Sequence, residues 1–198
     1  RGLSFGMRIA LVDSAIMAAV MLLIAAVVGV IGGNSTHRIV AHAAIMLTGV
    51  LALQIFSGNT RIVSFGHAAF MAIGAYTVGI LTQSGTLQKA ALPQLPSFMA
   101  GHELSLLPAL AAPVSVGLLI GALCGAALLR LSGAAAAIAT LAFLIIVYTV
   151  LIAARDVTRG SQPFYGVPRN VGMWTAVFVA IAALFIARGF RETARGLA

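Results

Sequence analysis

The sequence predicts an all-α fold, a polytopic membrane helix bundle of about six transmembrane helices. Apolar residues make up 61% of the 198 residues and charged residues only 8%, whereas soluble domains carry roughly 25% charged residues. The apolar residues also gather in six runs close to the roughly 20 residues that a helix needs to cross a bilayer core. In order, these runs are residues 9–31, 39–56, 63–81, 106–129, 134–154 and 171–187.

Each run is read as one helix because backbone polar groups in lipid must be paired within the segment itself. Turn-forming or charged residues bound every run; in order, these boundaries are residues 32–38, 57–61, 83–105, 130–133, 155–170 and the basic segment from Arg188. The second, third and sixth runs are short, so we expect one of them to be tilted, broken or incomplete. The loops 83–105 and 155–170 contain prolines and are too irregular to lie in lipid.

The distribution of basic residues predicts a cytoplasmic N-terminus. With this orientation seven of the 12 Lys and Arg residues lie inside: Arg1, Arg8, Arg61, Arg130, Arg188, Arg191 and Arg195. The five outside are Arg38, Lys89, Arg155, Arg159 and Arg169, mostly in the two long loops, whose charges count least. We therefore attribute the net charge of +8 to the membrane topology of the chain and to contacts with lipid headgroups. We do not attribute it to nucleic-acid binding. The single cysteine, Cys124, excludes a disulfide within the chain.

Small residues recur at every fourth position of the fourth run, at Gly117, Gly121 and Gly125. In lipid, such a stripe lets two helix backbones approach closely. We expect it to pack against another helix, either within this subunit or in a neighbouring subunit.

The third run places Ser64, Gly66 and His67 at the head of an apolar helix-length segment. An unpaired polar group in hydrocarbon costs roughly 2–7 kcal/mol, so these side chains should face protein or a wet cavity. Helical spacing puts Ser64, His67, Met71 and Gly74 on one stripe, with Tyr76 on the opposite side. The segment predicts part of a pathway or a tight helix contact.

Three readings of His67 stay open. It is a neutral histidine bonded to a backbone carbonyl near the helix start, it lines or gates a pathway, or it relays protons. No carboxylate lies at helical spacing from it.

Three motifs carry a resemblance to a known family. They are Ser-Phe-Gly-His-Ala-Ala-Phe at residues 64–70 followed by Ile-Gly-Ala-Tyr at 73–76, then Arg-Leu-Ser-Gly at 130–133 with Ile-Ala-Thr-Leu-Ala-Phe at 138–143, and Thr-Arg-Gly-Ser at 158–161 with Gly-Val-Pro at 166–168. In this order and spacing they resemble the LivM/LivH-type permease subunits of bacterial branched-chain amino acid ABC importers. Our candidate substrate pathway is Ser64, Gly66, His67, Met71, Gly74, Tyr76 and Thr140.

The resemblance implies one permease subunit of a pair in the bacterial cytoplasmic (inner) membrane, translocating branched-chain or related amino acids. Its expected partners are a second permease subunit, two cytoplasmic ATPase subunits and an external solute-binding protein. The resemblance also implies that Arg188, Arg191 and Arg195 approach the helix that contacts the ATPase. We expect residues 1–198 to form one incomplete permease domain, with later spans and most of that coupling helix beyond residue 198.

The chain itself is not expected to hydrolyse ATP or to hold a cofactor or metal. A Walker A loop ends in Gly-Lys-Ser/Thr, and Ala90 follows the only lysine, Lys89. No His-Glu-x-x-His pair occurs, which disfavours a zinc-dependent intramembrane enzyme. The alternatives kept open are the same permease type acting on urea, short amides or sugars, a passive channel or facilitator, and an assembly scaffold.

Overall fold

The computed structural model describes residues 2–60, 64–96, 100–101, 103–128, 131–163, 165–168 and 171–191. Within these residues the chain forms eight helices and no strands, which confirms the predicted all-α fold. The helices are α1 (Gly2–Ile31), α2 (Asn34–Thr60), α3 (Gly66–Thr82), α4 (Gly85–Ala91), α5 (Leu106–Leu128), α6 (Gly133–Ala153), α7 (Arg155–Thr158) and α8 (Met173–Arg191).

Five of these helices, α1, α2, α5, α6 and α8, are long and apolar enough to cross a membrane. The sixth predicted span, α3, has 17 residues, which at about 1.5 Å per residue gives roughly 26 Å against a hydrocarbon core of about 30 Å. The helices that contain the second and sixth apolar runs, with 27 and 19 residues, are longer than those runs. Helix α2 begins at Asn34 and α8 continues to Arg191. Both helices extend beyond the predicted apolar runs because backbone hydrogen bonding continues through the polar residues next to them.

The chain divides into two compact units, which are described separately. One comprises Arg1–Ile62 and Val171–Ala198, and the other Val63–Asn170. That residues 1–198 form a single permease domain stays a prediction.

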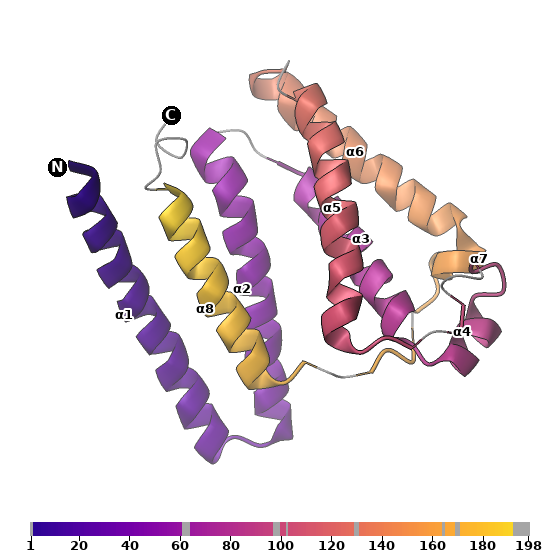
Figure 1. Ribbon diagram of the computed structural model, residues 1–198, viewed down its shortest axis with the longest axis horizontal. Helices are drawn as coiled ribbons and strands as arrows, with labels where there is room; N and C mark the ends of the chain where they lie inside the picture. Colours follow the sequence, from indigo (N-terminus) through magenta and orange to yellow (C-terminus); the bar gives the residue numbers. More distant parts are fainter. Residues whose placement is uncertain are drawn as a thin grey trace. The chain divides into compact units, whose positions relative to one another are not determined.

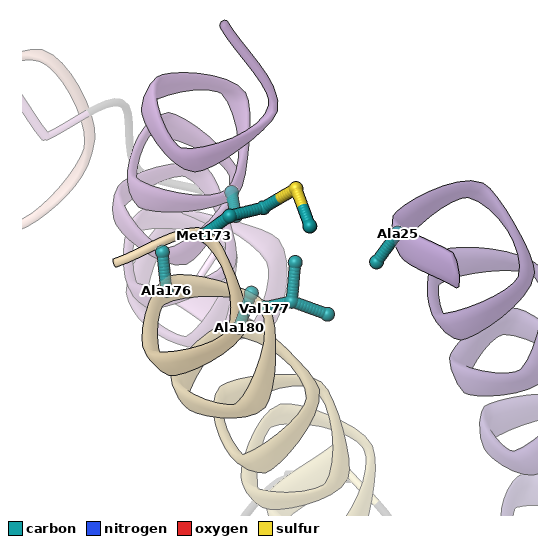
Figure 2. Close-up of a cluster of buried hydrophobic side chains, with 6 residues drawn as sticks. Ala25, Met173, Ala176, Val177 and Ala180 are labelled. Atoms are coloured by element: carbon teal, nitrogen blue, oxygen red, sulfur yellow. The ribbon is translucent and has the colours of Figure 1, made fainter. Parts of the chain in front are cut away.

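In the first unit, α8 packs against both α1 and α2 (Figure 1). Four alanines, Ala25, Ala44, Ala176 and Ala180, are buried at these contacts together with Met173 and Val177. Figure 2 shows Met173 and Val177 extending from α8 towards Ala25 on α1. Small residues suit helix contacts in lipid because backbone approach and dispersion, rather than burial from water, hold the helices together.

The directions of these three helices follow from their contacts. Trp174 at the start of α8 lies 3.3 Å from the position of a Cβ on Gly29, near the end of α1. Arg188, near the end of α8, reaches Met17 at the middle of α1. Helix α8 therefore runs antiparallel to α1 and parallel to α2, so that the ends of α2 and α8 lie at the same end of the unit (Figure 1).

The packing of α8 gives a first prediction. Replacing Ala180, which is fully buried in this cluster, by leucine is expected to force the helices apart at a cost of about 1–3 kcal/mol. The thermal unfolding midpoint of the detergent-solubilised protein should fall. The matched control is Ala182→Leu, at an exposed position of the same helix; an equal fall for both variants would contradict the packing.

In the second unit, α3 packs against both α5 and α6. The loop between α3 and α5, predicted to be irregular, contains the short helix α4. The fully buried side chain of Gln88 on α4 donates to the carbonyls of Ile80 (2.8 Å) and Gln83 (3.0 Å) and accepts from Gly101 N (2.8 Å). One amide side chain thus fixes this loop on the end of α3.

Candidate functional site at the start of α3

Helix α3 begins at the contact between the first motif (residues 64–76) and the second motif (residues 130–143). Ser64 and Phe65 precede the helix, and Gly66 is its first residue. The backbone N–H of Phe65 donates to Thr140 Oγ1 on α6 (3.2 Å), and the Thr140 hydroxyl donates to the carbonyl of Ala137 (2.8 Å). Thr140 is only 4% exposed, and its hydroxyl gives a backbone donor at the start of the helix an acceptor within the protein.

Gly66 lies directly against α6 at this contact. A Cβ added at Gly66 would lie 3.4 Å from Phe143 Cδ1, 3.6 Å from Thr140 Cβ and 3.7 Å from the Thr140 carbonyl oxygen. These are ordinary contact distances, so the site has room for a methyl group and for nothing larger.

One turn further along α3, an aromatic contact continues the same interface. The rings of Phe70 and Phe143 lie 5.3 Å apart at an interplanar angle of 44°, a tilted arrangement that is favourable for aromatic pairs. On its other side Phe70 approaches α5, where a Cβ on Gly121 would lie 4.0 Å from Phe70 Cε1. Phe70 therefore joins α3 to both of its neighbours.

The predicted stripe of His67, Met71 and Gly74 lies on a side of α3 that is less covered by neighbouring helices. Ser64 lies before the helix, so the helical stripe starts at His67. Met71 is 47% exposed, and a Cβ on Gly74 would meet no described atom within 4 Å. Ser64, His67 and Tyr76 are half-buried, and each has an interaction partner. A role of these residues in a pathway stays a prediction.

The predicted glycine stripe of α5 is only partly engaged. Gly121 faces Phe70, whereas a Cβ on Gly117 or Gly125 would meet no atom within 4 Å in the described part of the chain. Whether those two glycines pack against another subunit stays a prediction.

The third motif forms a tight turn at the end of α7. The Thr158 hydroxyl donates to the Ala154 carbonyl (2.8 Å) and accepts from Gly160 N (3.2 Å). Arg159 and Gly160 both adopt left-handed backbone conformations, with φ of 66° and 62°. A Cβ on Gly160 would lie 2.8 Å from the Ile152 carbonyl oxygen, so only glycine fits there.

This turn holds the Arg159 side chain over the following loop. Its guanidinium lies 4.2 Å above the Tyr165 ring, a favourable cation–π distance, and donates to Gln162 Oε1 (3.1 Å). With Arg155 and Ser161 these residues line a basic pocket of 260 Å³. We did not single out this pocket from the sequence, although the motif at residues 158–161 marks it.

Two of the three arginines predicted to approach the ATPase lie at the end of α8 and line a pocket. Arg188 and Arg191 line a pocket between α2 and α8 that includes Gln54. Arg195 lies outside the described residues. No group of three His, Cys, Asp or Glu side chains in the described ranges is placed to hold a metal ion.

The family described as "Branched-chain amino acid transport system / permease component" matches residues 35–190. The chain belongs to this permease family. The match runs from the first turn of α2 almost to the end of α8, and it includes all three motifs. No curated protein and no solved structure matches the chain.

Membership confirms the resemblance derived from the motifs. This permease is a multi-pass membrane protein of a transporter family, not of an enzyme family. The structure adds that the first two motifs of the permease touch each other through Gly66, Thr140 and Phe143.

Proposed function

We propose that this permease is the membrane-spanning subunit of an ABC importer that carries branched-chain amino acids across the bacterial cytoplasmic membrane. The observation that carries the proposal is the family match over residues 35–190. The motifs of α3 and α6 support it, because they meet at a contact between two helices and not at a constellation of catalytic groups.

The energy for import comes from partners in this proposal. Two cytoplasmic ATPase subunits hydrolyse ATP, a second permease subunit completes the path, and the chain itself holds no cofactor. The N-terminus and the ends of α2 and α8 face the cytoplasm. Arg188 and Arg191 lie in the last turn of α8, on that side.

The proposed substrate path follows the uncovered side of α3. His67, Met71 and Gly74 line it, with Ser64 at its mouth. The opposite side of α3 is fixed to α5 and α6 through Gly66 and Phe70. Closure of the ATPases then moves these packed helices as one body, and the permease pair rocks between outward and inward openings.

An external solute-binding protein is proposed to dock at the end of the second unit that carries α4 and α7. The basic pocket with Arg155 and Arg159 supports this, because an arginine fork binds a carboxylate with two hydrogen bonds. None of the residues described as lining it is acidic.

Reconstitution in proteoliposomes tests the proposed function. The full-length permease pair, its ATPases and its binding protein should give ATP-dependent leucine uptake, and loaded binding protein should stimulate ATP hydrolysis. Urea, a short amide and a pentose are the competing solutes, and preference for one of them would reassign the substrate. Equal uptake without the ATPases would replace the importer by a passive facilitator.

A further inference from the structure

A second basic pocket lies between the last turns of α2 and α8, within the first unit. It has a volume of 130 Å³ and is lined by four residues from each helix: Leu51, Gln54, Ile55, Gly58, Leu184, Ala187, Arg188 and Arg191. Both helices contact each other along much of their length, so the pocket belongs to one rigid face and not to a loop.

The pocket has an apolar floor and a polar rim. Leu51 and Leu184 are buried, with 7% and 5% exposed surface. Gln54 and Arg191 are exposed, and Arg188 is half-buried. A ligand that fits both parts carries a polar, anionic head and an apolar body.

Among the described residues that line this pocket, two are positively charged and none is negatively charged. Arg188 Nη2 lies 3.5 Å from Met17 Sδ on α1, and a thioether sulfur is only a weak acceptor. The lining residues given above include no carboxylate. Arg188 and Arg191 are three positions apart on one helix face, so two guanidinium groups serve the same small volume.

The pocket lies at the ends of two helices that are long and apolar enough to cross a membrane, where lipid headgroups are expected. Two candidate membrane spans, Asn34–Gly58 and Met173–Arg191, end at the pocket. Guanidinium groups bind phosphate oxygens with paired hydrogen bonds, and basic pockets between transmembrane helices on the cytoplasmic side bind anionic headgroups.

We propose that this pocket is a specific site for an anionic phospholipid, with its phosphodiester on Arg188 and Arg191 and its glycerol and upper acyl chain over Leu51 and Leu184. Gln54 donates a further hydrogen bond to the headgroup. The site goes beyond the transport function and does not depend on the identity of the transported solute. It differs from simple snorkelling of arginine to the interface, which favours no particular lipid at a defined position.

Lipid retention by the purified full-length protein tests the site. Native mass spectrometry of protein from nanodiscs that contain equal amounts of phosphatidylglycerol and phosphatidylcholine should show phosphatidylglycerol retained selectively. The double variant R188Q/R191Q should reduce this selective retention at least tenfold. R191Q alone, at an exposed position, should weaken retention while leaving the helix contacts intact. The matched control is R38Q, at the opposite end of α2.

Two further measurements distinguish a lipid site from a site for free phosphate, and lipid binding by the two arginines from ATPase binding by them. Inorganic phosphate at millimolar concentration should not displace the lipid, and displacement would overturn a lipid site in favour of a simple anion site. ATPase subunits should still copurify with R191Q. Unchanged lipid retention in both variants, or loss of ATPase copurification with retention unchanged, would overturn the proposal.

Discussion

Replacing Gly66 by leucine is expected to abolish transport and to destabilise the second unit. The atoms around a Cβ at this position lie at 3.4–3.7 Å, so the added isobutyl group must displace Phe143 or the backbone of α6. Overpacking of this kind costs about 1–3 kcal/mol, and here it also breaks the contact that holds the head of α3. The measurements are leucine uptake by the reconstituted complex and the thermal unfolding midpoint of the purified protein.

Two glycine variants serve as controls for this result. Gly66→Ala should keep both stability and uptake, because a methyl group fits at ordinary contact distance. Gly74→Leu should leave the unfolding midpoint unchanged, since a Cβ there meets no described atom within 4 Å, and it should lower uptake through the predicted path. Normal uptake by Gly66→Leu would contradict the role of the α3–α6 contact, and normal uptake by Gly74→Leu would remove that residue from the path.

The membrane spans could be predicted from the sequence because lipid imposes a simple rule on it. A spanning segment must be apolar and pair its own backbone, so residues 106–129 predict α5 to within one residue. The pairing of the spans could not be predicted. Alanine and glycine occur on many faces of these helices, and nothing in the sequence marks the contacts of α8 with α1 and α2.

The two short helices in the loops were missed for a different reason. Helix α4 has seven residues, too few to be stable alone. It is held by tertiary contacts, above all by Gln88, whose burial could not be inferred from a polar side chain in a polar segment. The same holds for α7, where the Thr158 hydroxyl and a left-handed Arg159 end the helix.

The sequence predicted the start of α3 as part of a pathway or a tight helix contact, but it did not predict that the contact is with the second motif. The motifs marked Gly66 and Thr140 separately, and the bond between Phe65 and Thr140 joins residues 75 positions apart. Phe70 and Phe143 lay within the motifs, yet only the structure shows them packed on each other. Gly66 therefore has a packing role in addition to the predicted pathway role.

Replacing Thr140 by valine is expected to loosen the start of α3 without changing the volume of the side chain. Valine keeps the shape of threonine but removes the oxygen that accepts the Phe65 N–H. This bond is part-buried, and the loss of an ordinary intramolecular hydrogen bond costs about 0.5–1.5 kcal/mol. The unfolding midpoint should fall, ATP-driven uptake should slow, and hydrogen exchange at the Phe65 amide should accelerate.

Two threonine variants make this test specific. Thr140→Ser keeps the hydroxyl oxygen and should retain most of the stability and the slow exchange of Phe65. Thr149→Val, on the same helix, removes an exposed hydroxyl that bonds only to the Ile145 carbonyl within its own helix and should have little effect. If Thr140→Val behaved like Thr149→Val in stability, uptake and amide exchange, the hydrogen bond from Phe65 would not be what holds the first motif on the second. The alternative would then be that the ring contact between Phe70 and Phe143 fixes α3 on α6 by itself.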